Sequence, residues 1–300
     1  MERQQNEWLS PSSKLEGFSW RHGRTADTKG ILIWSQPFLV EKSNREEVVV
    51  LLMDTQGAFD SQSTVKDCAT IFAFSTMISS VQIYNLSQNV QEDDLQHLQL
   101  FAEYGRLAKE KSRSKPFQSL MFLIRDWQCP QEAAYGFKGG EKILNETLEV
   151  SEGQHAELRQ LRQDIRGWFE KLQCFLMPHP GLRVATNHTF DGKLDEVEPE
   201  FKEMLQVLVP KLLQPDNLVL KKINSKEITC RELLEYFKGY AKVFQEGKLP
   251  DLLSVFTANA EVNNQKAVTA ALKIYNNGME LRLDGNTSYL STEELNNLHE

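Results

Sequence analysis

Apolar and polar positions alternate along the first 215 residues in two distinct rhythms. Short apolar runs rich in β-branched residues predict strands over residues 30–40, 48–53, 80–85, 118–124 and 174–177. Between them, apolar residues recur near every 3.6 positions and predict helices, most clearly over 93–111, 153–172 and 200–213. Near-continuous apolar strands that alternate with helices are typical of a mainly parallel sheet covered on both faces. The pattern therefore predicts an α/β domain over residues 1–215.

The pattern changes after residue 215 and becomes helical. Residues 216–250 are expected to form a linker with one helix, which begins at the capping-box pair Thr229 and Glu232. Helical periodicity returns over 252–278, and 291–294 resembles the start of another helix. One or two helices cannot bury their apolar faces alone. Residues 251–300 are therefore expected to be part of a helical bundle that is incomplete or completed by a partner.

Composition narrows the class of protein. A net charge of −8 argues against a nucleic-acid-binding surface, which is usually basic. The four cysteines lie far apart and form no C-x-x-C pair, so we expect reduced thiols in a cytosolic protein and no metal held by Cys or His. The polar start of the chain does not resemble a signal peptide, and no window approaches 18 uninterrupted apolar residues. We therefore expect a cytosolic chain with no direct membrane span.

The apolar run 48–53 ends at Asp54, and Gly57 follows three positions later. Ligands of open parallel sheets bind beyond the carboxyl ends of the strands. A carboxylate there can hold Mg²⁺, and the N–H of a glycine can approach a γ-phosphate because no side chain blocks it. Asp-x-x-Gly after an apolar strand is the switch II pattern of GTPases, although an ordinary strand-ending turn has the same form.

A polar loop upstream of this run contains Arg21 and Thr28. The hydroxyl of a switch I threonine binds Mg²⁺ and closes its loop over the γ-phosphate. Arg21 could reach a phosphate or a partner. A single loop threonine is usually structural or exposed to solvent, so the argument for Thr28 rests on its position ahead of the Asp54 strand.

Two further loops could bind a base. Arg125 and Asp126 follow the apolar stretch "SLMFLI", and a carboxylate there can accept hydrogen bonds from guanine N1–H and the exocyclic amine. The planar guanidinium of Arg125 could stack on the base, although a surface ion pair would explain the same two letters. After the run 174–177, Val184 and Asn187 in "VATN" could cap the base.

Taken together, "LLMDTQGAFDSQSTVKDCATIFAFSTMISSVQIYNLSQNVQEDDLQHLQLFAEYGRLA", "FLIRDW", "HPGLRVATN" and "LPDLLSVFTANAEVNNQKAV" closely resemble the atlastins. These are dynamin-superfamily GTPases related to the guanylate-binding proteins, and they use Arg-Asp where other GTPases use N-K-x-D. The resemblance implies GTP and Mg²⁺ as ligands, catalytic roles for Arg21 and Thr28, and Thr28 and Asp54 as metal ligands. It implies nucleotide contacts from Gln56, Gly57, Arg125, Asp126, Val184 and Asn187.

The resemblance also exposes a departure from the family pattern. Atlastins begin the GTPase domain with a strand, a Gly-Lys-Ser phosphate loop and a helix, but no G-x-x-x-x-G-K-[ST] occurs in these 300 residues. The GTPase-type domain over 1–215 is therefore expected to be incomplete at its N-terminus, and the bundle over 251–300 to be partial. This makes enzymatic GTP hydrolysis by the chain itself an open question.

Three interpretations remain. The first is an atlastin-like GTP-binding domain from the machinery of homotypic endoplasmic-reticulum membrane fusion, on the cytoplasmic side, with impaired catalysis in this form. The second is a non-catalytic module that forms homodimers, or heterodimers with full-length atlastins, and modulates them. The third is a truncated product without a stable fold, because loss of a strand and a helix exposes apolar surface.

Overall fold

The expected parallel sheet is formed by β5 (Val81–Ser87), β6 (Phe117–Arg125) and β7 (Phe169–Leu176), in that spatial order. Ser87 pairs with Arg125, and Ile124 pairs with Leu176, so the carboxyl ends of all three strands lie at one edge. The computed structural model describes residues 7–10, 13–20, 27–57, 65–99, 115–244, 252–283 and 291–293. Central strand β6 is buried along almost its whole length because both its edges and both its faces are covered.

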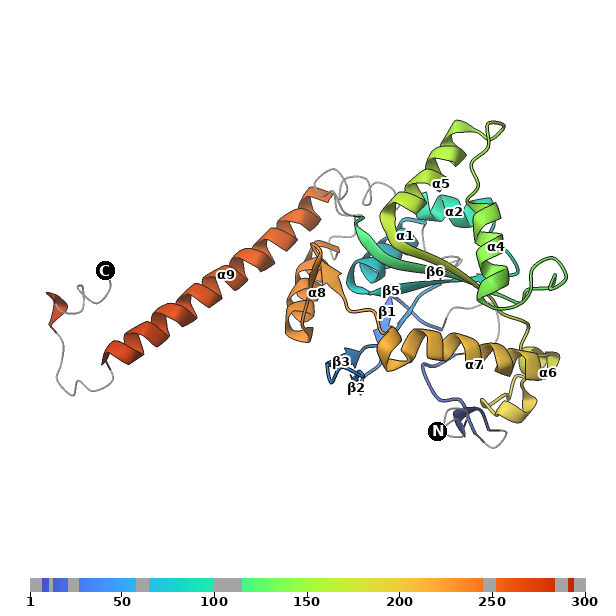
Figure 1. Cartoon of the computed structure of the whole chain (residues 1–300), viewed down its shortest axis with the longest axis horizontal. Helices are drawn as coiled ribbons and strands as arrows, with labels where there is room; N and C mark the ends of the chain where they lie inside the picture. The colour runs from blue at the N-terminus through green and yellow to red at the C-terminus, as the bar shows by residue number, and fades with distance from the viewer. Residues whose placement is uncertain are drawn as a thin grey trace.

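Helices cover both faces of this sheet (Figure 1). Leu120, Phe122 and Ile124 of β6 belong to the larger core, which also holds buried side chains of the helices on that side. Met121 belongs to a second core with Leu208 of α7 (Pro199–Leu213). Among the helices of the α/β part, α1 (Val65–Ile78), α2 (Glu92–Gln99), α4 (Phe137–Thr147) and α5 (Ala156–Trp168) contribute to the larger core, which the C-terminal helices also join through Tyr236, Tyr240 and Ala258. The predicted α/β class, with a mainly parallel central sheet, is confirmed.

The two N-terminal apolar runs were expected to be single strands, and this was wrong. Run 30–40 divides into β1 (Ile31–Ile33) and β2 (Phe38–Glu41), and run 48–53 divides into β3 (Glu47–Val50) and β4 (Met53–Thr55). β1 pairs antiparallel with β4, and β2 pairs antiparallel with β3. The β1–β4 pair and the β2–β3 pair together form one antiparallel ribbon. This ribbon bends between the two pairs, because more residues separate β1 from β2 than separate β3 from β4, and because Pro37 has no N–H to donate to the ladder.

One helix end also differs from expectation, and the end of another lies outside the described residues. The helix expected over 153–172 ends at Trp168, and β7 begins at the next residue, five positions before the expected strand start. No residue separates the two elements, and apolar Trp168 and Phe169 continue the hydrophobic pattern across the boundary. The helix expected over 93–111 is represented by α2, because residues 100–114 lie outside the described part.

The C-terminal part is mainly helical, as expected. A short hairpin of β8 (Lys222–Ile223) and β9 (Lys226–Glu227) leads into α8 (Cys230–Phe244). The predicted capping box is present: the Glu232 carboxylate accepts from the Thr229 backbone N–H at 2.8 Å, and the Thr229 hydroxyl accepts from the Glu232 N–H at 3.3 Å. α9 (Leu252–Leu283) packs against α8 and then projects from the body of the molecule (Figure 1).

Short elements complete the description. They are η2 (Glu7–Leu9), α6 (Leu182–Thr186), η3 (Leu194–Glu196) and η4 (Pro215–Asn217). None of the helices in the described part combines the length and the apolar composition that crossing a membrane requires.

Candidate functional site

The loops after β5 and β6 meet at the carboxyl edge of the parallel sheet. The Gln88 backbone N–H donates to the Arg125 carbonyl at 2.7 Å, which extends the pairing of the two strands by one step. Trp127, two residues after β6 ends, donates its backbone N–H to Met177 at 3.1 Å and its indole N–H to Ala133 at 2.8 Å. The Arg125–Asp126 pair is therefore carried by a loop that is fixed on both sides.

Asp126 adopts a left-handed backbone conformation, with φ of 58°. Asp is among the few side chains that tolerate this region, and such conformations gather at functional sites. The Asp126 carboxylate accepts a hydrogen bond from the Ser87 hydroxyl at 3.2 Å and lies 3.6 Å from the Arg125 guanidinium. Arg125 also donates Nε–H to the Asn85 side-chain oxygen at 2.6 Å. Four polar side chains from β5 and the end of β6 thus form one connected group.

The loop after β7 holds the other two predicted base contacts. Gly181 has a φ of 110°, and an added Cβ would lie 2.7 Å from the Glu198 side chain, so this turn requires glycine. Val184 packs against a small apolar cluster that includes Leu194 and Val197. Asn187 is tied within its own loop: its amide donates to Glu196 at 3.3 Å. Within the described part of the chain, no hydrogen bond or ion pair joins Val184 or Asn187 to the Arg125–Asp126 group.

The two predicted metal ligands, Thr28 and Asp54, come together. The Thr28 hydroxyl donates a hydrogen bond to the Asp54 carboxylate across 26 positions of sequence. Asp54 is the middle residue of β4 and pairs with Leu32, so it does not end its strand as expected. A hydroxyl and a carboxylate in contact are the hard oxygen donors that suit Mg²⁺, which usually takes one or two protein ligands and completes its shell with water and phosphate. Consistently, the described part contains no cluster of three or more His, Cys, Asp or Glu side chains arranged as an all-protein cage.

Gln56 and Gly57 follow Asp54 directly. The Gln56 backbone N–H donates to the Gly30 carbonyl at 2.8 Å, and the Gly30 N–H donates back to the Gln56 side chain at 3.0 Å. These bonds hold the Thr28 loop against the segment after β4. A Cβ added at Gly57 would meet no atom of the described residues within 4 Å, so no side chain crowds this position. Arg21 lies outside the described residues.

Sequence reasoning overlooked Asn85, Ser87 and Cys68. The Cys68 thiol lies 3.9 Å from the Gly57 carbonyl, within reach of a weak hydrogen bond. Asn85 and Ser87 could have been found, because alternation along "VQIYNLS" places both on the less buried face of the strand, near its carboxyl end.

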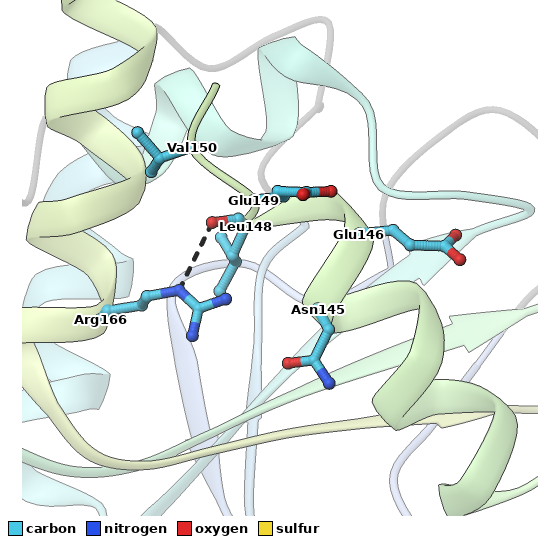
Figure 2. A pocket seen from close by; sticks show the side chains of 6 residues that line it. All are labelled: Asn145, Glu146, Leu148, Glu149, Val150 and Arg166. Atoms are coloured by element: carbon cyan, nitrogen blue, oxygen red, sulfur yellow. Dashed lines mark hydrogen bonds between the residues drawn. The ribbon is translucent and has the colours of Figure 1, made fainter. Parts of the chain in front are cut away.

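A surface pocket of about 520 Å³ lies elsewhere, where α4 ends beside α5 (Figure 2). Its only basic side chain, Arg166, donates to the Leu148 carbonyl at 3.4 Å, so it is directed at the end of α4. None of the predicted site residues lines this pocket, and it carries no argument for nucleotide binding. The lining residues are Asn145, Glu146, Leu148, Glu149, Val150 and Arg166.

Comparison with known proteins identifies the family of the chain. The family model "Guanylate-binding protein, N-terminal domain" matches residues 5–222. Atlastin-2 from Xenopus laevis is 54% identical over 300 residues, which is 100% of this chain and 53% of that protein. Atlastin from Drosophila melanogaster is 55% identical over 98% of this chain and 54% of its own length. Human Atlastin-3 is 56% identical over 97% of this chain and 54% of its own length.

The chain therefore spans about half the length of the curated relatives that it matches. The family match covers the sheet, the Thr28–Asp54 contact and the Arg125–Asp126 loop, and the identity to atlastins extends through α8 and α9. By its sequence and by its fold, the chain belongs to the guanylate-binding-protein family, on its atlastin branch.

Proposed function

We propose that this chain is an atlastin-like guanine-nucleotide-binding domain that uses GTP with Mg²⁺. The observation that carries the proposal is the Arg125–Asp126 group at the carboxyl edge of the sheet, in a chain of this family. Asp126 accepts the guanine N1–H and exocyclic amine, and adenine offers no such pair of donors. Arg125 supplies a planar cation that stacks on the base.

The phosphate end of the nucleotide is assigned to the Thr28–Asp54 contact. Thr28 and Asp54 hold Mg²⁺ through oxygen, and the Gly57 N–H donates to the γ-phosphate. The bonds between Gly30 and Gln56 keep both loops together around the ion. Bound Mg²⁺ supplies positive charge that balances the phosphate oxygens. For Arg21, the proposal is a contact to phosphate or to a partner.

We propose further that this 300-residue chain, taken alone, hydrolyses GTP slowly. A Gly-Lys-Ser loop normally supplies backbone donors, a lysine for the β- and γ-phosphates and a metal ligand, and the 300 residues contain no such motif. Loss of one preorganised donor commonly lowers the rate by roughly 10²–10³, and several are involved here.

A phosphate-release assay with GTP and Mg²⁺ tests this on the chain and on Asp54→Ala. We expect a rate near the uncatalysed background for both, so the substitution changes turnover very little. Robust turnover that disappears in Asp54→Ala would contradict the proposal, because it would mean that other residues hold the phosphates. Selective binding of GTP over ATP, measured by calorimetry or by NMR titration, tests the binding half of the proposal separately.

A second candidate function is a non-catalytic module that pairs with full-length atlastins at the cytoplasmic face of the endoplasmic reticulum, where the family's membrane-fusion role would place it. The observation that favours pairing is the exposed apolar row of α9, which includes Val268 (52% exposed), Leu272 (55%) and Tyr275 (40%). Fluorescence anisotropy of the labelled chain against a full-length atlastin tests it. Binding that survives removal of nucleotide would favour the module, and no binding with or without GTP would exclude it.

A further inference from the structure

We propose that Asn85 and Ser87 are positioning residues for base recognition, because each holds one member of the Arg125–Asp126 pair in a fixed orientation. Asn85 accepts from Arg125 Nε–H at 2.6 Å, and Ser87 donates to the Asp126 carboxylate at 3.2 Å. This inference rests on the proposed function and adds the residues that make its guanine specificity possible.

Strand alternation places both positioning residues on one face of β5. Burial alternates along this strand, with Tyr84 and Leu86 buried and Asn85 and Ser87 exposed. Successive side chains of a strand point to opposite faces, so residues 85 and 87 lie side by side on the same face. The register with β6, in which Ser87 pairs with Arg125, brings this face next to the end of β6.

Arg125 and Asp126 are consecutive, yet both reach this one face. An ordinary strand would send them to opposite faces. The left-handed conformation of Asp126, with φ of 58°, breaks the alternation and turns its carboxylate towards Ser87 while Arg125 contacts Asn85. The unusual backbone therefore has a definite result: a cation and a carboxylate lie side by side, each tied to a different residue of β5.

The contacts from Asn85 and Ser87 leave one Asp126 oxygen and the guanidinium face of Arg125 available to a base. Ser87 and Arg125 both approach Asp126 at Oδ2, so the carboxylate is held in one rotation with its other oxygen, Oδ1, available as an acceptor. Arg125 is bonded through Nε, which fixes the plane of a guanidinium whose side chain is otherwise 44% exposed. A base reader needs this fixed orientation, because a rotating carboxylate would accept from other hydrogen-bond donors as readily as from guanine.

The test measures the ratio of GTP to ATP affinity with Mg²⁺ by NMR titration of the complete chain, a method that also detects weak binding. Ser87→Ala and Asn85→Ala remove one contact each. We expect either substitution to reduce the GTP preference by roughly tenfold, since hydrogen bonds to charged groups are worth about that factor. Ser87→Thr keeps the hydroxyl and fits a strand, so it should retain the preference. Ser151→Ala, in the exposed loop before α5, is the matched control and should change nothing.

A second readout reports on the contact itself. The ¹⁵N–H signal of Arg125 Nε, assigned through its loss in Arg125→Lys, should shift in Asn85→Ala and stay in place in Ser151→Ala. Guanine preference that survives both Ser87→Ala and Asn85→Ala would overturn the positioning role and leave the proposed function intact. Equal loss of GTP and ATP affinity would also overturn it, because a merely structural role predicts that result. Equal binding of GTP and ATP by the unaltered chain would instead overturn the proposed function, and the positioning role with it.

Discussion

The conformation of Asp126 is the residue-scale feature on which base recognition depends. After glycine, Asp and Asn are the residue types that best tolerate its left-handed backbone. Asp126→Asn therefore preserves the fold and the shape of the side chain while replacing one acceptor oxygen by a donor. This makes it a cleaner probe of recognition than alanine.

We predict that Asp126→Asn abolishes the preference for GTP over ATP. The amide has one acceptor oxygen in place of two, and its NH₂ group opposes the guanine amine. The measurement is the ratio of the two affinities by NMR titration, with the thermal midpoint as a check on folding. An unchanged ratio in a folded variant would exclude Asp126 as the base reader.

Arg162 is a buried charged residue that connects three helices. Its side chain is 6% exposed, and it donates to the Thr147 carbonyl at 2.8 Å, to the Leu158 carbonyl at 3.2 Å and to the Glu92 carboxylate. It thereby joins the N-terminus of α2 to the C-terminus of α4.

We predict that Arg162→Met lowers the free energy of unfolding by about 1–3 kcal/mol, because it leaves the Thr147 carbonyl without its donor. Glu92→Gln should cost clearly less, since the Glu92 side chain is 51% exposed and water replaces the lost charge interaction. Urea denaturation of both variants gives the comparison. A larger loss in Glu92→Gln would show that the ion pair, and not the carbonyl contacts, dominates.

At the scale of elements, α8 and α9 meet along a seam of matched polar pairs. Tyr236 donates to Asn263 at 2.8 Å, and Tyr240 donates to Asn259 at 2.7 Å. Lys266 reaches Glu232 at 3.2 Å and lies 4.5 Å from the centre of the Tyr236 ring. Sliding one helix along the other would separate the partners of each pair, so these contacts set the register between α8 and α9.

One carboxylate of this seam, Glu232, makes the stability of the α8–α9 pair depend on acid pH. The pKa of Glu232 is lowered from 4.5 to about 2, chiefly by the hydrogen bond from the Thr229 backbone; burial opposes this lowering, and the Lys266 ammonium and the Thr229 hydroxyl add to it. A carboxyl whose pKa is depressed on folding stabilises the fold above pH 4.5, and this contribution is lost as the pH falls towards about 2.

We therefore predict that Glu232→Gln lowers the thermal midpoint at pH 7 and reduces its decline between about pH 4.5 and pH 2. Glu235, which pairs with Lys238 one turn away on the surface, supplies the matched control: Glu235→Gln should leave the acid profile nearly unchanged. Parallel profiles for Glu232→Gln and the unaltered chain would rule out a role for this carboxylate in stability.

The elements also show what could be read from the sequence. Run 118–124 lies within β6 because that strand is buried along almost its whole length, whereas run 174–177 covers only the end of β7, whose earlier residues include the exposed Glu170 and Lys171. Run 48–53 looks like run 118–124, but its pairing partner changes from β2 to β1 within the run, and periodicity carries no information about partners. The capping box was found because Thr229 and Glu232 act locally, whereas the bonds of Asn85 and Ser87 to residues about 40 positions away depend on the register of the sheet.

At the scale of the whole molecule, α9 carries apolar side chains that the described structure leaves exposed. Val268, Leu272 and Tyr275 follow helical spacing along one side, and Ile274 and Leu281, 75% and 79% exposed, lie on another. α9 buries Ala258 against α8, so its apolar surface is covered near its start and open further along.

We predict that this surface causes the chain to self-associate at micromolar concentration, because exposed apolar rows of this kind favour contact over hydration. Leu272→Glu should shift the sedimentation coefficient towards that of a monomer. Val207→Glu, on α7 and 45% exposed, removes an isolated apolar residue and should leave self-association unchanged. Equal sedimentation of the unaltered chain and Leu272→Glu would show that α9 does not mediate contact between copies.

The bent ribbon of β1 to β4 connects two distant places. At one end lies the Thr28–Asp54 contact, and at the other the turn residue Ser43 donates its backbone N–H and its hydroxyl to Asp216, at 3.0 and 2.7 Å. Ten residues of strand span up to roughly 30 Å. The ribbon is therefore attached at its Ser43 end, through two hydrogen bonds, to the segment that leads into α8. An environment-sensitive dye attached beside Ser43 would test whether movement at Asp54 reaches this end of the ribbon, from a position outside the proposed nucleotide site.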